Sequence, residues 1–153
     1  METNWQPILE NDFIRLEPLQ SDDFEKLYKV ASNPLVWEQH PNKNRYKREV
    51  FQTFFEGALA SGGAFLIYDT AKNEVVGSTR FYDYNEENKT ILIGYTFYAK
   101  SAWGKGYNYA VKNCMLAYAF QFVDKIIFHV GAENYRSQKA MAKLPAKKID
   151  EII

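Results

Sequence analysis

The chain has 153 residues, of which 46% are hydrophobic and 25% are charged. These values are close to those of ordinary globular proteins, so they exclude the disordered and fibrous classes, and the length predicts a single domain over residues 1–153. The 19 basic and 19 acidic residues cancel, which argues against nucleic acid as a partner because no overall positive field attracts it.

The first half of the chain predicts one strand followed by two helices. Apolar and charged residues alternate before Pro18, as they do in a strand with one buried face. Ser21 is expected to cap the first helix, because its hydroxyl can accept a hydrogen bond from the first turn. Prolines and asparagines then indicate a loop with one short helical turn, and helical spacing returns until the glycines after Ser61. The expected bounds are strand 13–17, helix 21–31, loop 35–45 and helix 46–61.

The second half predicts an antiparallel meander of three strands, a helix, a strand and a last helix. The short β-branched run at 126–130 is typical of a strand buried on both faces. It follows the helix directly, which implies parallel pairing with the third meander strand. Asn134 or Ser137 is expected to cap the last helix. The expected bounds are strands 64–70, 74–84 and 90–99, a helix with its apolar face at 107–122, strand 126–130 and a last helix through Leu144.

The order β-α-α-β-β-β-α-β-α defines an α/β (α+β) class with a mixed, mainly antiparallel sheet and flanking helices. Aromatic residues make up 16% of the chain and often occupy alternating strand positions, so they are interpreted as core residues. Only one cysteine is present, which excludes an internal disulfide. The sequence also shows no signal-peptide pattern and no apolar stretch long enough for a membrane span. Together with the single cysteine, these features predict a cytoplasmic protein without membrane contact.

The stretch from Trp103 to Asn108 holds two glycines at a junction between a strand and a helix. Glycines let the backbone approach a ligand closely, and the N–H groups of a first helical turn have no partner within the helix. Such a turn suits a phosphate or pyrophosphate, and Lys105 adds positive charge. A plain tight turn is the alternative. Neither the P-loop pattern nor the three-glycine dinucleotide pattern is present.

These residues resemble a motif of the GNAT acyltransferases, and of their RimJ/RimL-like group in particular. The motif is Gln/Arg-x-x-Gly-x-Gly/Ala, and this chain matches it at Gly106 but departs from it at Trp103 and Asn108. The Asn108 side chain would then crowd the pyrophosphate. The segment 133–141 resembles the Asn-x-x-Ser segment that follows the fifth strand of the family. The resemblance implies a GNAT-like sheet with a splayed parallel strand pair, acetyl-CoA as the acyl donor and no metal.

By the same resemblance, the strand before the motif presents its backbone to the pantetheine arm of acetyl-CoA, and the thioester carbonyl lies near the N–H of Thr96 or Phe97. The implied cofactor-binding residues are Phe97, Tyr98, Trp103, Gly104, Lys105, Gly106, Tyr107, Asn108 and Asn134.

The implied reaction is acetyl transfer to a primary amine, either a protein N-terminus or a small molecule, by direct attack in a ternary complex. An ammonium group must lose a proton before it attacks, and His40 and Glu38 in the loop between the first two helices are rival candidates for the base. Many family members have a tyrosine where Met141 stands, so Ser137 or a water is the candidate proton donor. Cys114 is interpreted as helical core and not as a nucleophile.

Two features depart from the family. Pro145 replaces a usual glycine, and the sequence ends at Ile153, before the two strands that normally complete the sheet. A sheet shortened in this way leaves an apolar edge on the fifth strand, which predicts a homo-oligomer or a partner chain. The departures also keep open an alternative function, that of a non-catalytic acyl-CoA-binding or scaffold protein with a degenerate fold.

Overall fold

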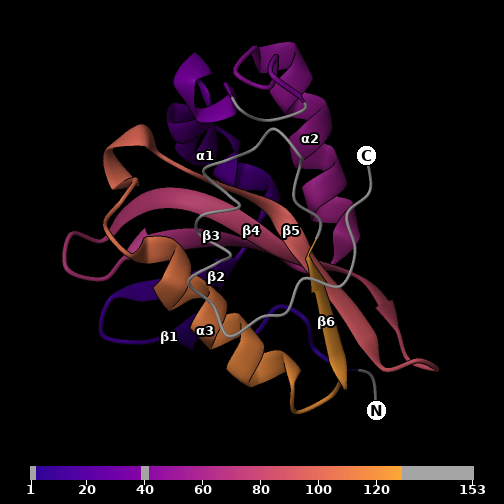
Figure 1. The fold of residues 1–153 in the computed structure, drawn as a ribbon. Helices are drawn as coiled ribbons and strands as arrows, with labels where there is room; N and C mark the ends of the chain where they lie inside the picture. Colours follow the sequence, from indigo (N-terminus) through magenta and orange to yellow (C-terminus); the bar gives the residue numbers. More distant parts are fainter. Residues whose placement is uncertain (1–2, 39–41, 129–153) are drawn as a thin grey trace.

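The computed structural model describes residues 3–38 and 42–128, which build a mixed sheet of six strands with flanking helices (Figure 1). No helix in these two ranges is long and apolar enough to cross a membrane. The strands are β1 (Leu9–Glu10), β2 (Ile14–Pro18), β3 (Ala64–Asp69), β4 (Glu74–Asn85), β5 (Thr90–Tyr98) and β6 (Lys125–Phe128). The helices are α1 (Phe24–Ala31), α2 (Arg48–Ser61) and α3 (Tyr107–Ala119), with 3₁₀ turns at Ser21–Asp23, Pro34–Trp37 and Lys100–Ala102.

The strands lie side by side in chain order, and all neighbours from β1 to β5 are antiparallel. The last pair is parallel, with Thr90 opposite Lys125 and Ile93 opposite Phe128. Helix α3, orange in Figure 1, crosses one face of the sheet and joins these two strands. The parallel pair and the mainly antiparallel sheet predicted from the sequence are therefore confirmed.

The alternation of β3 divides the core into two layers. Phe65 and Ile67 pack with Val111 and Met115 of α3 on one face of the sheet. Leu66, between them, packs on the other face with the aromatic residues of α1 and α2. Each fully buried side chain of this size stabilises the fold by about 1.5–3 kcal/mol. The predicted aromatic core is confirmed by buried rings on both faces: Trp37, Phe51, Phe54, Phe55, Phe65, Phe81 and Phe97.

The start of the first helix differs from the prediction. Ser21 does not cap a helix but is the first residue of a 3₁₀ turn that leads into α1. The carboxylate of Asp23 accepts a hydrogen bond from the backbone N–H of Gln20 at 2.8 Å. Gln20 is the residue that precedes the turn. The carboxylate of Asp23, and not the hydroxyl of Ser21, therefore stabilises the start of the turn.

The prediction that strand 126–130 is buried on both faces is wrong for its described residues, 126–128. Ile126, Ile127 and Phe128 are only half-buried, because β6 is the edge strand of the described sheet. The expected last helix, with Asn134 and Ser137, lies outside the described residues, as does His40.

Candidate active site

The chain enters α3 through two glycines in the left-handed region of backbone conformation. Gly104 has φ of 74° and Gly106 has φ of 85°, values that side chains disfavour. The space beside both α-carbons is open, with no heavy atom within 4 Å of an added Cβ. Gly106 is the N-cap of α3, and no side chain caps the helix. The first-turn N–H groups of this 13-residue helix therefore have no side-chain cap, and open space lies beside the glycines that precede them.

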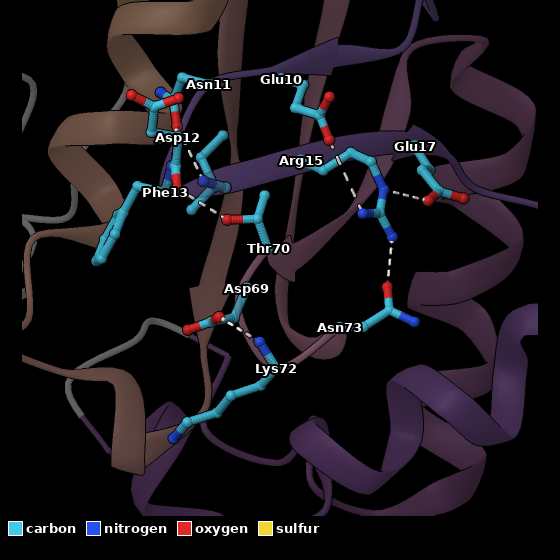
Figure 2. Close-up of polar contacts among 11 residues, drawn as sticks. Glu10, Asn11, Asp12, Phe13, Arg15, Glu17, Asp69, Thr70, Lys72 and Asn73 are labelled. Atoms are coloured by element: carbon cyan, nitrogen blue, oxygen red, sulfur yellow. Dashed lines mark hydrogen bonds and ion pairs between the residues drawn. The ribbon is translucent and has the colours of Figure 1, made fainter.

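Tyr107 fastens the start of α3 to the end of β3. Its ring stacks on Phe13 with centroids 4.7 Å apart, and its hydroxyl donates to the Asp69 carboxylate. Asp69 also accepts from the backbone N–H of Lys72 at 2.9 Å, and Figure 2 shows this turn beside the polar contacts of β2. The carboxylate raises the pKa of Tyr107 to about 12, and the bond from Tyr107 lowers the pKa of Asp69. The Tyr107 side chain is thus committed to the fold, so only the backbone of this residue remains as a candidate for binding a ligand.

Hydrogen bonds also tie the predicted motif to the end of β5. The indole N–H of Trp103 donates to the backbone oxygen of Tyr98 at 3.2 Å. The Tyr98 hydroxyl donates to the side-chain oxygen of Asn108 at 2.9 Å. Asn108 therefore turns its side chain towards β5, contrary to the expectation that it crowds the space in front of the helix. Lys105 is exposed in the turn between the glycines.

β5 carries a bulge at the position where the sequence predicts the thioester. Ser78 pairs with Phe97 and Arg80 pairs with Gly94, so two residues of β5, Tyr95 and Thr96, lie opposite one residue of β4. Tyr95 has φ of 53°, which is uncommon for a residue with a side chain. Because a bulge leaves backbone groups without ladder partners, this segment can offer an N–H group to a ligand. The N–H groups of Thr96 and Phe97 lie in and directly after the bulge.

Sequence reasoning missed Lys112, which lies on α3 beneath this bulge. Its side chain is 3% exposed and donates to the Thr96 hydroxyl at 2.9 Å, and Thr96 also bonds the Thr79 hydroxyl at 2.8 Å. Burial lowers the pKa of the Lys112 ammonium group to about 7. The available signal was its position, because Lys112 directly follows Val111 and lies about one helical turn before Met115, and both of these residues were expected on the apolar face of the helix.

The predicted acceptor loop is only partly described. Trp37 is buried and its indole N–H donates to the backbone oxygen of Ala31 at 2.8 Å, which anchors the turn before the loop. Glu38 follows as an exposed residue, and no hydrogen bond or ion pair joins its carboxylate to the described part of the chain. His40 lies outside the described residues, as do Asn134 and Ser137 at the opposite end of the predicted site.

Within residues 3–38 and 42–128, no three His, Cys, Asp or Glu side chains gather in a cluster that could hold a metal ion. Cys114 is half-buried on α3, with its sulfur 3.2 Å from the side-chain nitrogen of Asn11. Burial raises the pKa of its thiol, which disfavours the reactive thiolate.

Comparison with known proteins agrees with this architecture. Residues 14–147 match the family model of the acetyltransferase (GNAT) domain, and the chain belongs to this family. No curated protein matched the sequence.

Three solved structures illustrate the shared fold. A GNAT-family acetyltransferase from Bacillus anthracis is 22% identical with a TM-score of 0.75, over 90% of this chain and 81% of its own. Mycobacterium smegmatis RimJ in complex with CoA-disulfide is 19% identical with a TM-score of 0.71, over 93% and 76%. Spermidine N-acetyltransferase from Vibrio cholerae, in complex with CoA and spermine, is 18% identical with a TM-score of 0.68, over 87% and 80%.

Proposed function

We propose that this protein is an acetyl-CoA-dependent N-acetyltransferase that transfers the acetyl group to a primary amine. Membership of the GNAT acetyltransferase family gives the class of reaction. The observation that carries the proposal is that α3 joins two features, the open glycine turn at its start and, through Lys112 and Thr96, the bulge of β5. One feature suits the pyrophosphate of acetyl-CoA, and the other suits its thioester.

The residues at the glycine turn fit this donor. The phosphates would lie against the first-turn N–H groups after Gly106, where the helix dipole favours negative charge. Lys105 would add a positive charge, and Trp103 would hold the turn against Tyr98. The pantetheine arm would follow the backbone of Phe97 and Tyr98, and Asn134 would hydrogen-bond to it.

The bound acetyl-CoA supplies an activated carbonyl carbon. The amine lone pair attacks this carbon, the C–S bond breaks, and the thiolate takes up a proton as it leaves. An N–H group at the bulge, from Thr96 or Phe97, would donate to the carbonyl oxygen as negative charge develops on it. His40 or Glu38 would accept the proton of the amine, and Ser137 would supply the proton to sulfur.

The acceptor is either a protein N-terminus or a small-molecule amine. The structural neighbours include both a RimJ and a spermidine N-acetyltransferase, so the shared fold is compatible with both kinds of acceptor. We place the activity in the cytoplasm and expect the half-buried edge at β6 to pair with a second copy or a partner.

Thermal unfolding with and without acetyl-CoA tests the donor site. Ligand at a hundred times its dissociation constant is expected to stabilise the protein by about 2.7 kcal/mol. Gly106→Glu places a side chain and a negative charge in the proposed phosphate space, so a folded variant should show no such shift. Gly62→Glu is the matched control, because Gly62 ends α2 with φ of 70° and equally open space.

The control separates backbone strain from loss of the binding space. If Gly62→Glu lowers the melting temperature but keeps the full response to acetyl-CoA, the response of Gly106→Glu reports the site itself. A response of Gly106→Glu equal to that of the wild type would overturn the placement of the donor. An unresponsive wild type would overturn the proposed function.

A further inference from the structure

A cavity of about 500 Å³ opens beside the β5 bulge, between the sheet and α2. Its lining includes Tyr95 of the bulge, Phe54 of α2 and two arginines, Arg45 from the loop before α2 and Arg80 from β4. Tyr95 directly precedes Thr96, one of the two proposed oxyanion donors, so the cavity lies next to the proposed thioester site that an acceptor amine would have to approach.

The two guanidinium groups lack the partners that buried arginines normally have. Neither Arg45 nor Arg80 makes a hydrogen bond or an ion pair with the described part of the chain, and one terminal nitrogen of Arg45 is buried without a hydrogen-bond partner among those residues. A buried donor without a partner costs about 1–3 kcal/mol, more when it is charged, so such a group calls for a ligand or another compensation.

Aromatic rings hold both arginines in place. The guanidinium of Arg80 lies 3.7 Å from the centroid of the Tyr95 ring, and that of Arg45 lies 4.6 Å from the Phe54 ring. Stacking on a ring orients the planar group but leaves its edge, where the N–H donors are, free to bind an acid. The rings therefore position the donors without satisfying them.

Charge in the cavity is unbalanced. Burial, with a smaller contribution from the neighbouring positive charge of Arg45, lowers the pKa of Arg80 to about 10 against an opposing effect of Tyr95. Burial also lowers the pKa of Arg45. Among the described residues that line the cavity, Glu49 is the one acidic residue, and it is exposed and forms no ion pair with either arginine.

We infer that this cavity binds the carboxylate of the acceptor, so that the substrate is an amine that itself carries an acid group. The inference rests on the proposed acetyl transfer. Two guanidinium forks can bind a carboxylate through paired N–H···O bonds, which orients the acid and the attached amine together. Stacked beside the bulge, the arginines would set the distance from the acid to the nitrogen that attacks. A simple polyamine would instead meet two positive charges here.

The test uses matched pairs of primary amines: linear amino acids of increasing length, each with its carboxamide, and a peptide with aspartate as its first residue beside the same peptide with asparagine. For the wild type, kcat/KM for the acid is expected to exceed that for its amide by about tenfold or more at the best length. A preference among the free amino acids identifies a small-molecule acceptor, and a preference among the peptides identifies an acidic N-terminus.

Variants locate the preference in the cavity. Arg80→Gln and Arg45→Gln should bring the ratio of kcat/KM for the acid to kcat/KM for its amide close to one. Arg45 lies outside regular structure, so its variant remains informative if loss of Arg80 from β4 impairs folding. Arg48→Gln is the matched control, because Arg48 is an exposed arginine at the start of α2 that pairs with Glu25, and it should keep the wild-type ratio.

A binding measurement separates this inference from the proposed function. Calorimetric titration of the CoA-saturated protein with the same acid and amide pairs reports the cavity even if no product forms. Tighter binding of the acid that Arg80→Gln or Arg45→Gln abolishes supports the cavity. Equal binding of acid and amide, or a preference that neither variant changes, overturns the inference about the cavity. Acetylation of the amides would then show that the transferase activity stands without an acid-binding cavity.

Discussion

Lys112 offers a direct test of how the bulge is built. Its side chain is 3% exposed and its ammonium nitrogen donates to the Thr96 hydroxyl at 2.9 Å. Burial lowers its pKa from an ordinary value of 10.5 to about 7. This difference corresponds to about 5 kcal/mol against the charged form in the folded protein. A group with so large a cost should be visible in the pH dependence of stability.

The sign follows from where the proton is bound. Below pH 7 the folded and unfolded states both hold the Lys112 proton, so the full cost of burying the charge is present. Between pH 7 and about 10.5 the folded state has released a proton that the unfolded state still holds. The free energy of unfolding therefore rises with pH in this window, and the Lys112 contribution gains about 2 kcal/mol between pH 7 and pH 9.

Urea unfolding of the wild type and of Lys112→Met between pH 6 and pH 9 measures this contribution. Methionine keeps most of the side-chain volume but cannot titrate. The unfolding free energy of the variant relative to that of the wild type should therefore be higher at low pH than at high pH. The difference in unfolding free energy should shift by about 2 kcal/mol towards the wild type between pH 7 and pH 9. Lys29→Met removes an exposed lysine of α1 and serves as the control. Parallel profiles for the wild type and Lys112→Met would refute the burial of a charged lysine.

Three further predictions concern the donor site and the chemistry. Gly77→Ala places a Cβ 2.1 Å from the backbone oxygen of Phe97, so it should lower the free energy of unfolding in urea by about 1–3 kcal/mol and weaken acetyl-CoA binding. An unchanged affinity for acetyl-CoA would show that β4 does not position the bulge. Cys114→Ala should keep wild-type kcat and cost about 1 kcal/mol of stability, whereas inactivation of a folded variant would point to a covalent step. Ser137→Ala should lower kcat about 100-fold with unchanged acetyl-CoA affinity, and a wild-type kcat would remove Ser137 as the proton donor.

Local patterns were sufficient for most of the regular structure. The alternation in β3, β4 and β5 and the helical spacing of α3 are properties of neighbouring residues, and the observed bounds lie close to the predicted ones. The glycine turn before α3 was also recognisable, because Gly104 and Gly106 are needed for its backbone conformation. The two-residue strand β1 was missed, since so short a pairing leaves no periodicity to detect.

The features that shape the candidate site depend on pairing across the fold. The bulge at Tyr95 arises from the register between β4 and β5, and the residue itself is not one that favours a positive φ. Arg45 and Arg80 lie far apart in sequence and share a cavity only because α2 covers β4. Neither position has a local signal that separates it from an ordinary solvated arginine, so only the structure brings them together.

The central claim is that the chain catalyses transfer from acetyl-CoA to an amine. The most direct measurement is release of free CoA thiol from acetyl-CoA with and without an added amine, with mass spectrometry of the amine in the same reaction. Thiol release that depends on the amine and matches the amount of acetylated product is the predicted result. Binding of acetyl-CoA without release of thiol for any primary amine, acidic, neutral or basic, would contradict the claim and leave an acyl-CoA-binding protein in its place.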